Sequence, residues 1–483
     1  MQGREQITLV TLNRASGDLQ GQIYHGLRTR ILGGSLPAGA RLPSTRQLAA
    51  SLGVARATVV VAYERLVAEG YLLNAAGRAS RVANIAPPAM PASCAARPPA
   101  PAIASTAIPV SAPPCLAPGV PDLTSFPIPL WGRLLASQAK RLAPQMLSYE
   151  NEFGLAALKE AILAHLAVRR GVVATSSQLV LLPSTRTAIA LIARVVLRRH
   201  SSAPAPIWVE DPAYPHARHI LKAEGGDLVP VPVDSLGIDI EQTSHLPTPR
   251  LLYVTPSHQY PTGVTMSLPR RLRLLELARQ SGAFILEDDY DSEFQFNGRP
   301  IAALQGIDQG DRVAYLGSLS KVLAPGVRLA YAVIPLSLLA EVQRAIRLEG
   351  IVVSAHIQAA FLGFLQEGHF SAHIRRMTRY YAMRMAAFRA ALEHICADSI
   401  TYGAGAGGLQ LALWFNNQNL NDKLIASALR PHGYAPAPLS TMYAREGRPG
   451  LLCGIANLIP AQASVAAGVI SALIKSYSGD ADL

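Results

Sequence analysis

A segment rich in proline and alanine divides the chain. Residues 86–118 hold eleven alanines and ten prolines in thirty-three positions. Proline lacks a backbone N–H and alanine buries little surface, so we expect an extended, semi-stiff tether rather than a packed element. At 483 residues the chain is also too long for one ordinary core. These features predict a folded domain over residues 1–83, a linker over 84–118 and a second folded domain over 119–483.

The N-terminal part has the pattern of three helices followed by a hairpin. Residues 19–32 repeat apolar side chains at helical spacing, and Ser44 is a natural N-cap for a second helix. A third helix is expected over about residues 55–69, because apolar residues at helical spacing flank its strand-like run of three valines. Residues 71–73 and 78–82 can pair as a hairpin. This order is that of a winged helix-turn-helix, whose second motif helix enters the major groove of DNA.

Positive charge is concentrated in this N-terminal part. Residues 1–83 contain ten arginines, no lysine and four acidic residues, an excess of six out of the chain's net charge of +12. A basic surface of this kind favours a polyanionic partner, although a solvated basic face is the plainer alternative. Together with the helix order, the charge indicates double-stranded DNA as the partner.

From residue 119 onward, helix-length segments alternate with short apolar runs. Helix-length connections between strands produce crossovers, so this pattern predicts a largely parallel α/β sheet. In an open sheet of this kind, ligands bind beyond the carboxyl ends of the strands. The expected strands are residues 179–182, 207–209, 251–254, 284–286, 313–316 and 330–334.

Three polar motifs follow expected strands. TPSHQYPTG occupies residues 255–263, EDDYDSEF occupies 287–294, and SLSK occupies 318–321, with Arg328 seven residues beyond its lysine. A nucleophilic lysine, a buried carboxylate and a cup of hydroxyls with an arginine are the groups that pyridoxal 5'-phosphate (PLP) needs. The lysine forms an imine, the carboxylate keeps the pyridine nitrogen protonated, and the cup holds the phosphate. The motifs therefore indicate a PLP site.

These residues carry a resemblance to known families. Residues 119–483 resemble the aminotransferase superfamily with the fold-type I PLP-binding architecture, and residues 19–82 resemble the GntR-type winged helix. The two joined in this order resemble the MocR subfamily of transcriptional regulators. The resemblance implies a mainly α winged helix-turn-helix, an α/β effector domain, and a homodimer that presents two DNA-binding heads.

The resemblance assigns residues to the cofactor site. Lys321 is expected to form the Schiff base with PLP, Asp288 to pair with the pyridinium nitrogen, and Tyr290 to contact the phenolic oxygen. Asp289 is the alternative to Asp288 if the register differs by one. Tyr214 is expected either to stack on the ring or to be a plain core tyrosine. The residues expected at the phosphate are Ser184, Thr185, Arg186, Ser318, Ser320 and Arg328.

The resemblance also assigns the DNA contacts. Arg56 and Thr58, at the start of the recognition helix, are expected to reach base edges or backbone, and Arg78 to serve the wing. The family usually has a serine before the arginine of this helix, whereas this chain has Ala55, so a side-chain N-cap is expected to be lost. The residues expected to approach the phosphates are Arg41, Ser44, Thr45 and Arg46.

One departure from the family concerns the effector. Enzymes of this fold and amino-acid-sensing relatives place an arginine on a late strand to bind a carboxylate. The corresponding strand, residues 451–455, has none, and Arg445 and Arg448 are the nearby alternatives. The sequence therefore predicts a PLP-dependent transcriptional regulator that senses an amine, an amino acid or PLP itself. A working aminotransferase with a DNA-binding appendage is the second hypothesis, and a regulator with a decayed cofactor site is the third.

The remaining sequence features bear on location. The four cysteines, Cys94, Cys115, Cys396 and Cys453, are far apart and fit no zinc spacing, so we expect a reducing cytoplasm and no metal site. No signal-peptide pattern is visible at the N-terminus. The uncharged run of residues 449–474 is long enough to raise a membrane span, but polar residues and a proline interrupt it. A buried strand followed by a docked helix is the expected structure there.

Overall fold

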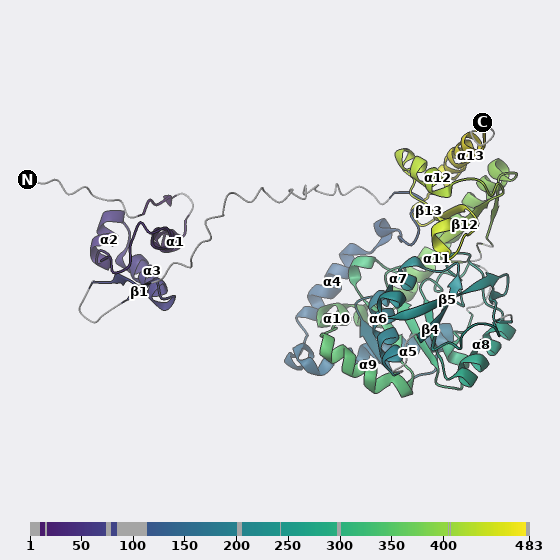
Figure 1. Ribbon diagram of the computed structural model, residues 1–483, viewed down its shortest axis with the longest axis horizontal. Coiled ribbons are helices and arrows are strands. Elements are labelled where there is room, and N and C mark those ends of the chain that lie inside the picture. Colours follow the sequence, from purple (N-terminus) through teal and green to yellow (C-terminus); the bar gives the residue numbers. More distant parts are fainter. Residues whose placement is uncertain are drawn as a thin grey trace, which may run out of the picture. The chain divides into compact units, whose positions relative to one another are not determined.

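The chain forms two compact units, residues 1–109 and 110–483. The computed structural model describes residues 10–14, 17–73, 79–84, 114–199, 205–241, 243–296, 301–403, 405 and 407–479 (Figure 1). The division falls within the predicted linker, and the predicted domain boundaries stay predictions. The end of that predicted linker packs against the second unit, because Leu116 is fully buried and forms a β-bridge with Gly454.

The described residues of the first unit form three helices and a two-stranded hairpin, so the predicted order of a winged helix-turn-helix is confirmed. The strands pair antiparallel, Leu72 with Val82. The valine run of residues 59–61 lies within a helix. The turn of the hairpin, with Arg78, lies outside the described residues. The elements are α1 (Leu19–Leu32), α2 (Thr45–Leu52), α3 (Arg56–Ala68), β1 (Leu72–Leu73) and β2 (Arg81–Val82).

The N-termini of α2 and α3 are capped differently. The Ser44 hydroxyl accepts a hydrogen bond from the Gln47 backbone N–H, and the Gln47 side chain accepts one from the Ser44 backbone N–H. This reciprocal pair is a capping box. Ala55 holds the cap position of α3 and offers no side-chain acceptor, as the sequence predicted. α3 is held by its core face instead, where Val59 and Leu66 are fully buried.

The second unit is built on an eight-stranded sheet with the order β3-β10-β9-β8-β7-β4-β5-β6. The pairing between neighbours makes β3, β4, β5, β7, β8 and β9 run in one direction, and β10 and β6 in the other. The predicted α/β class is confirmed, with β10 and β6 as antiparallel exceptions. The strands are β3 (Leu179–Leu182), β4 (Ala205–Asp211), β5 (Gly226–Asp234), β6 (Gly237–Ile238), β7 (Leu251–Val254), β8 (Phe284–Asp289), β9 (Val313–Ser318) and β10 (Ala330–Val333).

The reversal at β10 follows from the length of its connection. Only residues 319–329 separate β9 from β10, and they contain a turn and the short 3-10 helix η6 (Pro325–Val327). A parallel neighbour needs a crossover of about a dozen residues or more, usually with a helix, so the chain returns antiparallel. The connection, which carries Lys321 and Arg328, therefore stays at the carboxyl edge of the sheet.

Helices cover both faces of this sheet (Figure 1), and its central strands β7, β8 and β9 are buried along their whole length. Successive side chains of a strand point to opposite faces. Leu286 and Leu316 pack with residues of α6 and α9, whereas Ile285 and Val313 pack with residues of α8. The helices of this layer are α4 (Ile128–Ala139), α5 (Ala156–Arg170), α6 (Thr185–Arg198), α7 (Pro215–Ala223), α8 (Leu268–Ser281), α9 (Leu336–Glu349), α10 (Ala355–Gln366) and α11 (His369–Cys396).

A smaller antiparallel sheet follows, with the order β11-β12-β14-β13. The expected buried strand and docked helix within residues 449–474 are confirmed as β14 and α13, and Ile470 of α13 is fully buried in the core. Among the described residues, no helix is long and apolar enough to cross a membrane. The elements are β11 (Ile400–Tyr402), β12 (Gln410–Phe415), β13 (Ala437–Pro438), β14 (Gly450–Gly454), α12 (Asp422–Leu429) and α13 (Ala463–Gly479).

Residues 114–122, which we call the anchor segment, attach the start of the second unit to the rest of its fold. The Gly454 N–H donates to the Leu116 carbonyl at 2.9 Å. A side chain on Gly454 would place its Cβ 2.0 Å from the Ala117 carbonyl oxygen, so the approach requires glycine. Asp122 forms an ion pair with Arg384 of α11 at 2.9 Å. The last residues of the predicted linker and the backbone that follows them are therefore fixed in place.

The missing cap of α3 gives a stability prediction. Ala55→Ser is expected to stabilise the first turn of α3 by about 0.5–1 kcal/mol, because a serine hydroxyl can accept from an unpaired N–H of that turn. Hydrogen exchange of the α3 amides should slow by the matching factor. Ala50→Ser, within the already capped α2, is the control and should give no protection. Equal exchange in both variants would show that the cap contributes nothing.

Candidate functional site

A cavity of about 600 Å³ lies at the carboxyl edge of the large sheet. Its walls come from the ends of β7, β8 and β9, from the start of α6 and from the start of β12. The residues predicted at the cofactor all line it, which brings together stretches that are far apart in the sequence. They are Lys321, Asp288, Tyr290, Ser318, Ser320, Arg328, Tyr214, Ser184, Thr185 and Arg186.

Asp288 presents an unpaired carboxylate oxygen at this cavity. Its Oδ2 accepts a hydrogen bond from the Tyr253 hydroxyl at 2.7 Å, whereas its buried Oδ1 has no partner. Burial raises the pKa of Asp288 to about 6. A buried carboxylate oxygen without a partner is costly, and a positively charged N–H donor would relieve that cost. Asp289, the alternative, does not line this cavity and faces Arg170 instead.

Lys321 reaches the anchor segment. Its ammonium donates to the Gly119 carbonyl, and Gly119 has a φ of 72°. A Cβ on Gly119 would lie 2.8 Å from the Lys321 Nζ, so a side chain there would displace the lysine. Burial lowers the pKa of Lys321, while the carboxylates of Asp291 and Asp288 oppose that shift. A lowered pKa increases the fraction of Lys321 in its neutral, nucleophilic form.

Hydroxyls, helix N–H groups and a guanidinium also gather at the lining of the cavity. Ser184 caps α6, accepting from the Thr187 N–H at 3.1 Å, and leaves the first helical N–H groups directed at the cavity end of the helix. Arg328 closes η6 in the left-handed conformation with a φ of 53°. The Ser318 hydroxyl accepts from the Ser320 N–H at 3.0 Å. Hydroxyls, helix amides and a guanidinium of this kind suit a phosphate.

Four tyrosines line the cavity, and three of them, Tyr214, Tyr260 and Tyr290, contact one another or neighbouring side chains. The Arg186 guanidinium donates to the Tyr214 hydroxyl at 3.1 and 3.2 Å, and the Tyr214 ring lies edge-on to Tyr260. The Tyr290 hydroxyl lies 3.1 Å from the Nδ1 of His258. Burial opposes charge on His258, but the neighbouring carboxylate of Asp291 outweighs it and raises the pKa of the imidazole. His258 therefore helps to fix the position of the Tyr290 hydroxyl.

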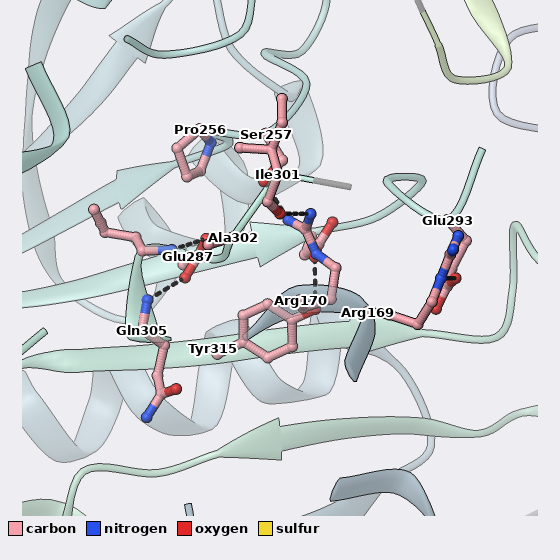
Figure 2. A network of polar contacts seen from close by, with 12 residues as sticks. Arg169, Arg170, Pro256, Ser257, Glu287, Glu293, Ile301, Ala302, Gln305 and Tyr315 are labelled. Carbon is pink, nitrogen blue, oxygen red and sulfur yellow. Dashed lines mark hydrogen bonds and ion pairs between the residues drawn. The ribbon is translucent and has the colours of Figure 1, made fainter. Parts of the chain in front are cut away.

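A buried ion pair between Arg170 and Asp289 lies at the end of β8, and Figure 2 shows Arg170 within this polar network. The Arg170 side chain, 2% exposed, donates to Asp289 Oδ2 at 2.8 Å and also to the Ser257 hydroxyl and the Ile301 carbonyl. The Tyr315 hydroxyl donates to the same Asp289 oxygen at 2.5 Å. Asp289 thus has both a cation and a hydroxyl as partners. This pairing fixes the end of β8 so that the preceding residue, Asp288, faces the cavity.

Sequence reasoning missed several residues of this site. Tyr253 holds Asp288, Gly119 accepts from Lys321, and Gln410 closes the cavity from β12. The sequence does show a tyrosine within an apolar strand and a glycine directly after the linker. Neither feature indicates which side chain the residue contacts. The proposed carboxylate-binding alternatives, Arg445 and Arg448, are not among the residues that line the cavity. Arg448 stacks over Trp414 instead.

Two of the residues predicted to contact DNA, Thr45 and Arg56, lie side by side in the first unit. The starts of α2 and α3 meet there, with the Arg56 Nε donating to the Thr45 hydroxyl at 3.5 Å. Arg41, near this pair in the sequence, forms a β-bridge with Arg81. Arg41, Ser44, Arg46 and Arg56 are exposed, and Thr45 and Thr58 are half-buried. Arg78 lies outside the described residues, so its predicted role is a prediction still.

Two family models match this chain. Residues 19–82 match the model of bacterial regulatory proteins of the gntR family, and residues 132–449 match aminotransferase class I and II. The chain therefore combines a GntR-type DNA-binding domain with a domain of a PLP-dependent family. Two transcriptional regulators are similar to this chain over most of their own length.

The probable rhizopine catabolism regulatory protein MocR of Rhizobium meliloti is 36% identical over 450 residues, which cover 91% of this chain and 90% of that protein. The HTH-type pyridoxine biosynthesis transcriptional regulator PdxR of Corynebacterium glutamicum is 32% identical over 368 residues, 75% of this chain and 76% of that protein. The chain belongs to the MocR-type family of GntR transcriptional regulators.

Solved structures agree with the fold of the second unit. The kynurenine aminotransferase of Pyrococcus horikoshii matches with a TM-score of 0.69 at 23% identity, over 76% of this chain and 92% of that one. LysN, the alpha-aminoadipate aminotransferase of Thermus thermophilus, matches with a TM-score of 0.68 at 24% identity, over 76% and 94%. At these identities the likeness establishes the fold-type I architecture alone.

The ion pair under β8 gives a second stability prediction. Arg170→Met is expected to destabilise the second unit by about 3–5 kcal/mol, because Asp289 would stay buried without its cation. Arg170→Met with Asp289→Leu removes both charges and should recover a large part of that loss. Urea unfolding followed by tryptophan fluorescence measures both, since Trp131, Trp208 and Trp414 all lie in the second unit.

The control for this prediction is the exposed pair of Arg279 with Glu276 on α8. Arg279→Met should cost less than about 1 kcal/mol, because water screens an exposed ion pair. A loss for Arg170→Met as small as the loss for Arg279→Met would contradict the supporting role of the buried pair.

Proposed function

We propose that this regulator binds PLP through Lys321 and senses an amine, an amino acid or PLP itself in the cavity of its second unit. In this proposal residues 1–83 bind operator DNA, residues 84–118 form a tether, and residues 119–483 bind the effector and form a homodimer. Membership of the MocR-type family supports the regulatory role over a purely enzymatic one. The residues of the cavity supply the support for the cofactor.

The observation that carries the cofactor proposal is the unpaired Oδ1 of Asp288. A protonated pyridine nitrogen is a cationic N–H donor, which is what this buried oxygen lacks. Pairing with that cation would also favour the charged form of Asp288, whose pKa burial raises to about 6. The Tyr253 hydroxyl on Oδ2 leaves only one oxygen free, so the position of the ring nitrogen is specified.

The remaining groups of PLP also find matching residues. The start of α6, the serines of the SLSK motif and Arg328 can hold a phosphate, and Tyr290 can contact the phenolic oxygen. PLP, when bound, supplies an aldehyde to which a primary amine attaches. Lys321, whose pKa burial lowers, is the amine that this chain offers. A PLP site is therefore consistent with each wall of the cavity.

The contact between Lys321 and the anchor segment suggests how the cavity acts on the tether. Lys321 would hold PLP through the cofactor's aldehyde, and its side chain would then no longer be free to donate to the Gly119 carbonyl as it does here. A ligand that left Lys321 free would preserve that hydrogen bond. Each ligand would thus favour a different arrangement of the segment leading to the DNA-binding unit, as allosteric control requires.

Exposed apolar side chains support the homodimer. Tyr149, 89% exposed, and Leu147 lie on two successive short 3-10 helices, and Ile128 is exposed at the start of α4. Large apolar side chains that water cannot solvate favourably are typical of protein interfaces. A homodimer would carry two DNA-binding heads and would match a repeated or palindromic operator.

The second candidate function is a working aminotransferase. Lys321, Asp288 and Arg328 would suffice for imine chemistry, so the cavity does not exclude a slow half-reaction. Sustained conversion of common amino and keto acids by the purified chain would favour the enzyme over the sensor.

The cofactor proposal predicts the behaviour of a lysine variant. The wild-type chain, mixed with PLP and freed of excess by gel filtration, should keep a visible absorbance band from the covalently held cofactor. Lys321→Ala should lose it, because no other lysine lines the cavity among the described residues. Lys423→Ala, at an exposed position of α12, is the matched control and should absorb like wild type. Equal absorbance in all three proteins would rule out Lys321 as the anchor.

The DNA proposal predicts the effect of a recognition-helix variant. Arg56→Ala should weaken binding to a selected operator duplex by about 1–3 kcal/mol if the guanidinium reads a base. Arg30→Ala removes the same charge from α1 and should weaken binding much less. Fluorescence anisotropy over a range of salt concentrations measures both, and affinity should fall steeply with salt. Equal losses would mean that net charge, rather than groove placement, explains the effect.

A further inference from the structure

We propose that the amine sensed in this cavity carries no carboxylate beside its amino group and is recognised through a hydrogen-bond donor, such as a hydroxyl, by Gln410. This inference deepens the proposed function and rests on it. It concerns the wall of the cavity that the small sheet contributes, where Leu409 and Gln410 are lining residues.

One face of the small sheet is directed at the cavity. Gln410 pairs with Gly454 and Ala412 pairs with Leu452 across β12 and β14. Because side chains alternate along a strand, these four residues share one face. Leu452 packs with Met442 and Tyr260, which both line the cavity. The sheet face next to the cavity therefore consists of these four residues, and none of them is charged.

The cationic side chains of the cavity are already assigned to the proposed cofactor. The lining residues include three cationic side chains, Arg186, Lys321 and Arg328. Lys321 is assigned to the cofactor aldehyde, and the two arginines flank the proposed phosphate site at the start of α6 and the end of η6. His216 also lines the cavity, but burial and the charges of Arg186 and Lys321 lower its pKa, so it is mainly neutral at neutral pH.

A ligand carboxylate at the small-sheet wall would consequently lack a counter-ion. Burying a carboxylate without a cation is unfavourable, and a neutral amide does not replace a guanidinium fork. The wall therefore discriminates against an amino acid that directs its carboxylate there. It does not discriminate against an amine whose corresponding group is neutral.

Gln410 offers the favourable contact that would select a neutral ligand. The residue is only 5% exposed and lies at the cavity. Its Nε2 donates to the Tyr290 hydroxyl at 3.3 Å, whereas its Oε1 is buried without a partner. An unpaired buried acceptor favours a ligand that brings a donor. A hydroxyl on the ligand would meet that requirement, and a carboxylate, which only accepts, would not.

Two simple amines separate these possibilities. L-alaninol and L-alanine share the same carbon skeleton and amino group, and differ in a CH₂OH group against a carboxylate. The full-length chain loaded with PLP is titrated with each, and the change in cofactor absorbance reports displacement of Lys321. Wild type should respond to alaninol at a concentration lower by about tenfold or more than to alanine.

Two variants test the assignment of residues. Gln410→Arg adds a guanidinium at the small-sheet wall and should reverse the preference, so that alanine acts at the lower concentration. Arg186→Gln removes a cation from the proposed phosphate site and should weaken PLP retention without changing the ratio between the two amines. A changed ratio in Arg186→Gln would place the ligand carboxylate at Arg186 and overturn the inference.

The outcomes for wild type distinguish the two levels of the proposal. Loss of all cofactor absorbance in wild type would refute the PLP site itself, and the inference with it. With absorbance present, an equal response, a stronger response to alanine or no response to either amine overturns the inference alone. An alaninol preference that Gln410→Arg reverses supports it.

Discussion

The end of β8 imposes the main constraint on this structure, because four buried carboxyl groups lie within residues 287–291. Each needs a partner of its own in a medium that solvates charge poorly. Glu287 accepts from two backbone N–H groups, Asp289 is paired with Arg170 and Tyr315, and Asp291 accepts from His258 and a backbone N–H. Of these four, Asp288 keeps an unpaired oxygen, and that residue lines the cavity. The carboxylate oxygen at the end of β8 that lacks a partner therefore lies where a cationic ligand can reach it.

The direction of the strands decides which residues surround that oxygen. Parallel strands bring the segments after β3, β4, β7, β8 and β9 to one edge, although these segments are far apart in sequence. The short return to β10 then keeps Lys321 and Arg328 at the same edge, where both line the cavity. A longer crossover would have carried that connection away. The cavity is thus a consequence of chain topology as much as of its motifs.

The strands and the motif residues could be predicted because they depend on local signals: apolar runs, caps and turn residues. The supporting residues could not, because periodicity gives the face on which a side chain lies but not its partner. Arg170 ends a helix more than a hundred residues before Asp289, and it looked like any arginine in a last helical turn. The end of the predicted linker could not be predicted either, for a different reason. Its composition is uniform, yet Leu116 at its end is buried, because backbone pairing with β14 does not depend on composition.

Control of DNA binding requires that the effector bind two arrangements with different affinity. The hydrogen bond from the Lys321 ammonium to the Gly119 carbonyl depends directly on the chemical state of the lysine. Hydrogen bonds that involve a charged group contribute about 1.5–3 kcal/mol. Making or breaking one such bond at the anchor segment would shift a two-state equilibrium by roughly tenfold to a hundredfold, which is the usual range of allosteric coupling. A change in this one polar contact would therefore supply coupling of the size that the proposed regulation requires.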